Sequence, residues 1–125
     1  MKRLTLGIAL TLALVGCTDQ GDPQTKDAKG RQISVDLAAG KALAEGECKA
    51  CHGLDGKGAA PGIPNLAAQR ERYLLGAMQA YKEGKRTHAA LRELITRMSD
   101  ADALNVAAYY ASLPPIASAF MLAWK

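Results

Sequence analysis

The sequence predicts a small all-α domain over residues 34–125, and three observations support this prediction. Apolar side chains recur every three or four residues in several segments, which is the spacing of one helix face. These segments stop at Gly, at Pro or before a Ser–Asp pair, which are typical helix boundaries. No stretch of the domain shows the alternating pattern of a strand. At 125 residues and 49% hydrophobic side chains, the chain has room for one such domain.

The first helix is expected to begin after Ser34, whose hydroxyl can cap its amino end. Its apolar side is predicted to comprise Val35, Leu37, Ala38, Ala42 and Leu43. The helix is expected to end near Gly46, shortly before a pair of cysteines.

Residues 53–64 are rich in Gly and Pro, and this composition predicts a loop. A helix is expected next, from Leu66 to Glu83, with Gly84 ending it. Its apolar positions recur at three or four residues, namely Leu66, Tyr73, Leu74, Ala77, Met78 and Tyr81.

A shorter amphipathic helix is predicted from His88 to Met98, through Leu91, Leu94 and Ile95. Residues 99–102 then match a capping box with Asp in the position usually held by Glu. The last helix is expected to run to about Leu113, where two prolines stop it.

The motif with the clearest chemistry is Cys48-Lys-Ala-Cys51-His52. Two thiols three residues apart, followed at once by an imidazole, form the attachment signature of c-type haem. Each thiol adds across one vinyl group on the same edge of the porphyrin. The turn between the thiols then places His52 under the iron as its proximal ligand. The sequence therefore predicts one covalently bound haem c.

Two other readings of the cysteine pair are weaker. A thioredoxin-like dithiol needs a βαβ setting, and no strand pattern surrounds Cys48 and Cys51. A structural zinc site needs four ligands, and the chain offers only His88 as a further histidine and no second cysteine pair.

Residues 1–16 are predicted to be a lipoprotein signal peptide. Their apolar run, Leu4 to Val15, follows two basic residues and is too short to span a bilayer comfortably. The run ends in a stretch that resembles the bacterial lipobox, in which the signal is cut before Cys17 and the sulfur then carries a diacylglyceryl group. An ordinary secretory signal with a stray cysteine is the alternative. Small Gly16 and apolar Leu14 favour lipidation, which also assigns the third cysteine.

Residues 17–33 are polar, contain Gly and Pro and lack an apolar period, so they are predicted to be a lipidated flexible tether. Acyl chains on Cys17 would hold the domain to a membrane without spanning it. The expected location is the periplasmic side of a bacterial envelope. Thr18, rather than Asp, follows the cysteine, and by resemblance to lipoprotein sorting in Gram-negative bacteria this favours the outer membrane.

The charge pattern gives no indication of a nucleic-acid partner. The formal net charge is +4, but Lys2 and Arg3 leave with the signal. The remaining chain has 14 of the 16 basic side chains and all 12 acidic ones, so its charges are nearly balanced. No basic run is interleaved with aromatic residues. His88 has no nucleophile or carboxylate partner nearby in sequence, so neither an enzyme activity nor a small-molecule substrate is expected.

Three stretches together resemble the class I (monohaem) cytochromes c of bacteria: residues 40–53, 63–69 and 99–113. The resemblance covers residues 36–113 and implies a fold in which helices wrap around the haem. It also implies that the first and last helices cross closely, with a small residue on one facing an aromatic on the other. Gly40 and either Tyr109 or Tyr110 are candidates for this pair, and ordinary core packing is the alternative.

Pro64 resembles the family's proline whose carbonyl oxygen accepts the Nδ1–H of the proximal histidine, here His52. That bond would fix the orientation of the imidazole and raise its basicity. A plain turn proline is the alternative.

The sixth iron ligand departs from the family's pattern. The family usually places a Met about seven residues before the capping Ser–Asp of the last helix, and here that slot holds Ala90 or Leu91. His88 lies one turn earlier, in a predicted loop, and Met98 lies immediately before the cap. His88, Met98 and an open or otherwise filled sixth site all remain possible distal arrangements.

The resemblance implies an electron carrier, not an enzyme, that shuttles single electrons between respiratory redox partners such as an oxidase or a reductase. A haem-based gas or ligand sensor with a weak or open sixth site is the alternative. The apolar tail from Ile116 to Lys125 is too short to span a bilayer, and either packs on the domain or docks through Trp124.

Overall fold

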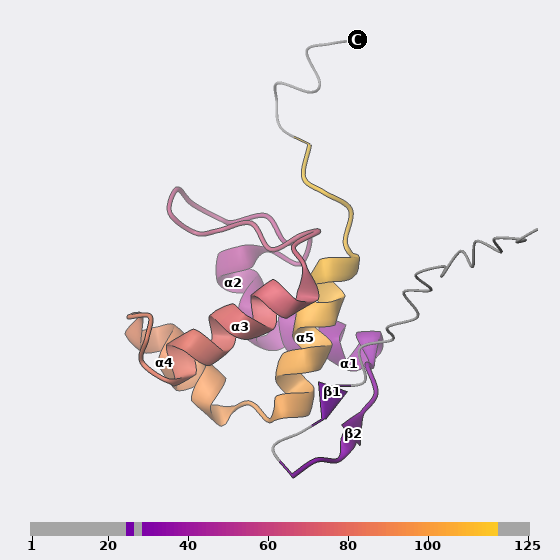
Figure 1. Cartoon of the computed structure of the whole chain (residues 1–125). Helices are drawn as coiled ribbons and strands as arrows, with labels where there is room; N and C mark the ends of the chain where they lie inside the picture. The colour runs from indigo at the N-terminus through magenta and orange to yellow at the C-terminus, as the bar shows by residue number, and fades with distance from the viewer. Residues whose placement is uncertain (1–24, 27–28, 118–125) are drawn as a thin grey trace, which may run out of the picture.

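Helices make up most of this computed structural model, which describes residues 25–26 and 29–117 (Figure 1). The all-α class is therefore confirmed. In chain order the elements are β1 (Thr25–Lys26), β2 (Gln32–Ile33), α1 (Leu37–Leu43), the π-helical turn η1 (Ala44–Cys48), α2 (Lys49–His52), α3 (Glu71–Lys82), α4 (Ala89–Arg97) and α5 (Asp100–Ser112).

The two short strands pair antiparallel within the segment expected to be a tether. Thr25 lies opposite Ile33 and Lys26 opposite Gln32. The ladder precedes α1 and lies near the end of the molecule where α5 begins (Figure 1).

The crossing of α1 and α5 forms the centre of the fold. Gly40 makes this approach possible, because a Cβ there would overlap the carbonyl oxygen of Asn105 and lie 3.0 Å from Tyr109 Cβ. The small-against-aromatic contact implied by the family resemblance is thus confirmed for Gly40 and Tyr109.

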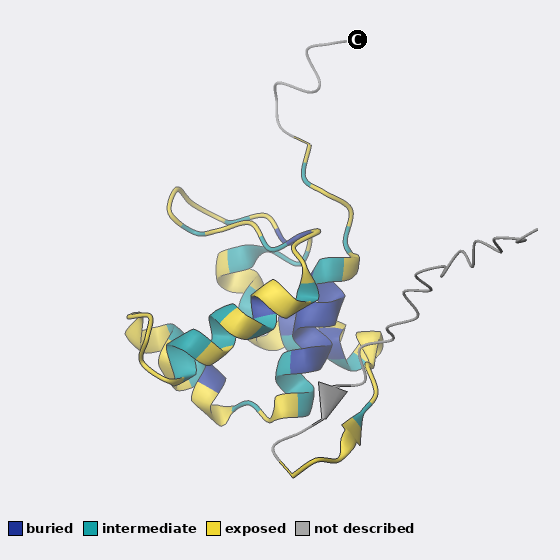
Figure 2. Cartoon of the chain, in the orientation of Figure 1, coloured by how far each residue is buried: buried dark blue, intermediate teal, exposed yellow. Residues whose placement is uncertain are grey.

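The core follows α5, whose residues 104–110 are all buried (Figure 2). Ala44 of η1 and Leu74 of α3 join Tyr109 and Tyr110 in one apolar cluster. Helix α3 packs on α5, and α4 packs mainly on α3. The last helix therefore supports both the segment that carries the two cysteines and the helix that precedes α4.

The first helix begins later than expected, at Leu37 with Asp36 as its cap, not Ser34. The Asp36 carboxylate accepts the N–H groups of Ala38 and Ala39 at 2.9 and 3.0 Å. Its backbone N–H donates to Asn105 Oδ1 at 2.8 Å, which fixes the entry of α1 against α5. Leu37, expected on the apolar side, is 47% exposed.

The predicted helix from Leu66 also begins later, at Glu71. Three hydrogen bonds hold the preceding residues in a loop: Leu66 and Ala67 donate to Gly56 O, and Ala68 donates to Tyr110 O at 3.1 Å. Ala68 adopts a left-handed conformation with φ of 57°, which a helix does not allow.

Candidate functional site

The two cysteines and the histidine of the attachment motif lie on one continuous helical stretch. Cys48 is the last residue of η1, and Cys51 and His52 are in α2. The turn before Cys48 is π-helical, a rare feature that is often found at functional sites. Cys48 is half-buried against the apolar cluster, whereas Cys51 is exposed. One short segment therefore presents both thiols and the imidazole.

The His52 ring is held by the residue that the family resemblance indicated. Its Nδ1 lies 3.0 Å from the carbonyl oxygen of Pro64. A carbonyl only accepts hydrogen bonds, so this contact places the ring proton on Nδ1 and leaves the Nε2 lone pair free for a metal.

Backbone N–H groups within the loop between His52 and α3 hold it closed through hydrogen bonds. Ala59 donates to Cys51 O at 2.8 Å, and Gly58 donates to Asn65 Oδ1 at 2.9 Å. Gly56 has φ of 74°, and a Cβ there would lie 2.6 Å from the backbone nitrogen of Ala67. The loop is therefore closed tightly enough to carry Pro64 back to the histidine.

Two hydroxyl groups from α5 reach this loop, a contact that the sequence did not predict. Tyr109 donates to Leu54 O and Tyr110 donates to Gly53 O, each at 2.9 Å. The signal was present in the sequence, because a buried tyrosine usually needs a partner for its hydroxyl. The partners themselves lie far away along the chain and have no local signature.

The environment of Cys48 argues against a redox dithiol. Burial, with smaller contributions from the charges of Glu47 and Cys51, raises the pKa of the Cys48 thiol to about 11. Catalytic dithiols need a thiol pKa lowered toward neutrality, so that the thiolate forms readily. A thiol that stays protonated at neutral pH does not fit a catalytic dithiol.

The described residues fit a covalently bound haem. The donor set is two thiols on one helical segment and an imidazole whose Nδ1 is already occupied. Apolar side chains that are only partly buried pack, like Cys48, against the buried cluster, namely Leu43, Leu54, Leu66, Leu75, Met78 and Leu113. Such half-covered apolar surface is suited to a porphyrin face.

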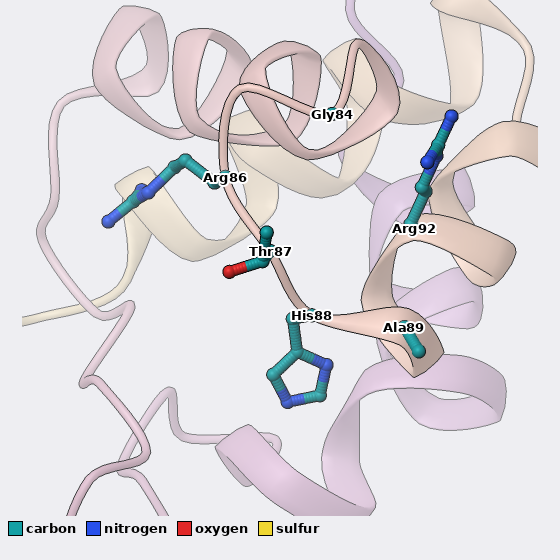
Figure 3. Close-up of a pocket in the computed structure, with 6 residues that line it drawn as sticks. All are labelled: Gly84, Arg86, Thr87, His88, Ala89 and Arg92. Atoms are coloured by element: carbon teal, nitrogen blue, oxygen red, sulfur yellow. The ribbon is translucent and has the colours of Figure 1, made fainter.

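The two distal candidates lie at opposite ends of α4. His88 is exposed at the amino end, and its Nδ1 accepts the N–H of Leu91 at 3.3 Å. Its imidazole also lies edge-on to Tyr81, with ring centroids 6.5 Å apart. In Figure 3 the imidazole projects away from the side chains of Arg86 and Arg92, which line the same hollow of about 220 Å³.

Met98 caps the carboxyl end of α4 and lines a different hollow, of about 680 Å³. That hollow also includes Ile33 of β2 and Ser99, the cap of α5. Met78 packs against the apolar cluster from α3, as expected for a core residue. Leu91, in the slot where the family usually has Met, is half-buried in the first turn of α4.

Several predictions concern residues that the structure does not describe. Cys17 with its signal peptide, and residues 118–125 of the tail, which include Trp124, lie outside the described residues. Within residues 25–26 and 29–117, no helix has both the length and the apolar character needed to cross a bilayer.

Comparison with known proteins agrees with the site geometry. Residues 37–114 match the profile of the family described as cytochrome c. Cytochrome c4 of Pseudomonas aeruginosa is 44% identical over 112 residues, which cover 90% of this chain and 49% of that protein. Cytochrome c-554(548) of Halomonas halodenitrificans is 42% identical over 80 residues, which cover 62% of this chain and 95% of that protein.

The fold has solved counterparts of the same kind. The crystal structure of reduced recombinant cytochrome c4 from Pseudomonas stutzeri superposes with a TM-score of 0.59 at 36% identity, covering 65% of this chain and 47% of that one. The chain spans about half the length of the cytochromes c4 that it matches. The family match includes both thiols, His52 and the crossing of α1 with α5. The chain therefore belongs to the cytochrome c family and has the fold of the class I c-type cytochromes.

Proposed function

We propose that this protein is a single-electron carrier with one covalently attached haem c. The observation that carries the proposal is the contact of His52 Nδ1 with Pro64 O. His52 lies on the same helical stretch as Cys48 and Cys51. Cys48 and Cys51 would hold the porphyrin through thioether links, and His52 would ligate the iron through Nε2. When bound, haem c supplies a reversible one-electron couple between ferric and ferrous iron.

The chain's own residues account for an electron-transfer role without substrate chemistry. Pro64 keeps the imidazole in one tautomer and one orientation, which limits rearrangement when the metal changes charge. Cys48 is half-buried and packs against the apolar cluster, so a thioether link through its sulfur would be held against the core. The partners would be other redox proteins, such as an oxidase or a reductase.

We propose His88 as the sixth ligand, because its imidazole is exposed in the stretch before α4, whereas Met98 lines the hollow that includes Ile33 and Ser99. The Nδ1 of His88 now accepts the N–H of Leu91, so the neutral ring carries its proton on Nε2. Ligation through Nε2 requires the proton to move to Nδ1, and ligation through Nδ1 uses the same lone pair. Either mode releases the cap of α4, which costs about 1 kcal/mol. Ligation by His88 is therefore expected to be about fivefold weaker than ligation by a histidine that caps no helix.

Substitution of the two distal candidates tests this assignment. In the haem-loaded protein, His88→Ala is expected to change a six-coordinate, low-spin spectrum into a high-spin one, whereas Met98→Leu leaves it unchanged. Magnetic circular dichroism in the near infrared distinguishes thioether from imidazole ligation. A thioether signal that disappears in Met98→Leu would contradict the assignment.

The cost of releasing this cap also makes a ligand-sensing module the second candidate function, because a His88 that returns to its capping position would open the sixth site. Rapid mixing of the ferrous protein with carbon monoxide separates the two functions. A carrier is expected to bind the gas slowly and to titrate reversibly with one electron. A protein that binds carbon monoxide completely within the mixing time and does not exchange electrons reversibly with isolated bacterial membranes would instead be a sensor.

We further propose that Cys17 carries lipid and anchors the domain at the periplasmic face of the envelope, with the outer membrane favoured. The support is the sequence Leu14 to Cys17 and the polar segment that follows it. The test is fractionation of cells that express the full chain, with Cys17→Ser as the variant. The wild type is expected in membranes with an acylated amino terminus, and wild type recovered as unmodified periplasmic protein would refute the anchor.

A further inference from the structure

The last helix sends two hydroxyl groups to the two peptide units that follow the proximal histidine. Tyr110 donates to Gly53 O and Tyr109 donates to Leu54 O, both at 2.9 Å. Tyr110 lies 57 residues from Gly53 in the chain, and Tyr109 lies 55 residues from Leu54. These contacts make the tyrosines more than packing partners of α1.

Both tyrosines are rigid supports. Tyr110 is 2% exposed and Tyr109 is 9% exposed, and their rings meet edge-to-face with centroids 5.3 Å apart. A tyrosine has few rotatable bonds, and here its helix is fixed by the close contact at Gly40. Burial raises the pKa of the Tyr110 hydroxyl, so this group stays protonated and able to donate.

The same helix also holds the far end of the loop. Ala68 donates to the backbone oxygen of Tyr110 at 3.1 Å, so residues 53–68 are attached to α5 at both ends. Pro64, the acceptor for His52, lies between these two attachments. The position of the Pro64 carbonyl relative to the imidazole therefore depends on α5.

We propose that Tyr109 and Tyr110 are positioning residues for the proximal ligand: their hydroxyls fix the backbone after His52 and keep its Nδ1 in contact with Pro64 O. This role rests on the proposed haem site and extends it. A tyrosine that only filled the core would contribute the same packing as phenylalanine and would leave the histidine's hydrogen bond unaffected.

The experiment compares haem-loaded wild type with Tyr109→Phe and Tyr110→Phe, which keep the rings and remove the hydroxyls. The readout is solvent exchange of the His52 Nδ1 proton in the reduced protein, measured by NMR, together with exchange of the Ala59 and Leu66 amides. Loss of one buried hydrogen bond is expected to accelerate these exchanges about tenfold. Tyr110→Phe is expected to affect His52 more, because its acceptor is the adjacent residue.

Tyr73→Phe is the matched control, because Tyr73 is 56% exposed and lies on α3. If the Tyr110 variant fails to accumulate, the Tyr109 variant gives the same test. Unchanged His52 exchange in both variants, even with lowered stability in urea, would overturn the positioning role. A wild-type protein without added porphyrin mass would instead refute the haem site on which the role depends.

Discussion

At the scale of single residues, one missing Cβ decides how closely α1 approaches α5. If Gly40 were alanine, its methyl group would overlap the carbonyl oxygen of Asn105, which belongs to the rigid backbone of α5. The same stretch of α5 places Asn105 Oδ1 to accept the N–H of Asp36. Any outward movement of α1 would therefore also weaken its amino-terminal anchor.

Gly40→Ala is expected to lower the free energy of unfolding by about 2–3 kcal/mol, because overpacking against backbone is relieved only by moving a helix. Gly76→Ala is the matched control in α3, where a Cβ meets nothing within 4 Å. That change is expected to stabilise by about 0.5–1 kcal/mol through helix propensity. Urea unfolding of the haem-loaded proteins measures both, and equal effects at the two positions would contradict the crossing.

Tyr110 is expected to make the protein sensitive to alkaline pH. Burial raises the pKa of its hydroxyl above the ordinary value of 10.0, so the unfolded chain releases this proton first. The stability contribution is fully present below pH 10 and is lost as the pH rises toward the folded value. The wild type is therefore expected to lose stability above about pH 10 more steeply than Tyr110→Phe. Parallel curves from urea unfolding between pH 8 and pH 12 would contradict this expectation.

At the scale of elements, the capping box before α5 depends on local sequence alone. Ser99 Oγ accepts the N–H of Asp102 at 3.1 Å, and the Asp102 carboxylate accepts the N–H of Ser99 at the same distance. Ser99→Ala is expected to cost about 1 kcal/mol. The double variant Ser99→Ala/Asp102→Ala is expected to cost less than the sum of the single changes, because the two groups form one unit. Additive costs in urea unfolding would contradict the reciprocal cap.

Elements defined by neighbouring residues were predictable, whereas those set by distant partners were not. The spacing of Leu91, Leu94 and Ile95 predicted α4 to within one residue at each end. The start of α1 was wrong because its cap is selected by Asn105, which is 69 residues away. Residues 66–70 were predicted to be helical, and bonds to Gly56 and Tyr110 hold part of them in a loop instead.

The same distinction applies to the candidate site. Cys48, Cys51 and His52 are adjacent in the chain, so their motif is visible in the sequence. The hydroxyls of Tyr109 and Tyr110 reach the site through the helix crossing, and no local pattern identifies their partners, Leu54 O and Gly53 O. The π-helical turn before Cys48 also lacks a signature: the first helix was expected to end near Gly46, and η1 instead continues from α1 to Cys48.

At the scale of the whole molecule, the described core is unevenly distributed. Residues of α1, η1, α3 and α5 share the central cluster, whereas α4 buries only Ile95 and packs mainly on α3 (Figure 2). A helix as short as α4 is not stable alone in water. We therefore expect α4 to depend on the haem for much of its order, whereas the α1–α5 pair depends on its own packing.

Removing both attachment points tests this division. In Cys48→Ala/Cys51→Ala, made without haem, the amides of α4 are expected to exchange with solvent nearly as fast as those of an unfolded chain. The amides of residues 104–110 in α5 are expected to keep protection, because they remain buried against Gly40 and Leu74. Hydrogen exchange followed by NMR or mass spectrometry measures both regions in one sample.

Equal protection of α4 and α5 would show that the polypeptide packs as a single unit without the cofactor. Equal loss would show that the α1–α5 crossing also requires it. The expected gradient arises because the tight backbone contact at Gly40 belongs to the chain itself, whereas α4 has only one buried side chain of its own.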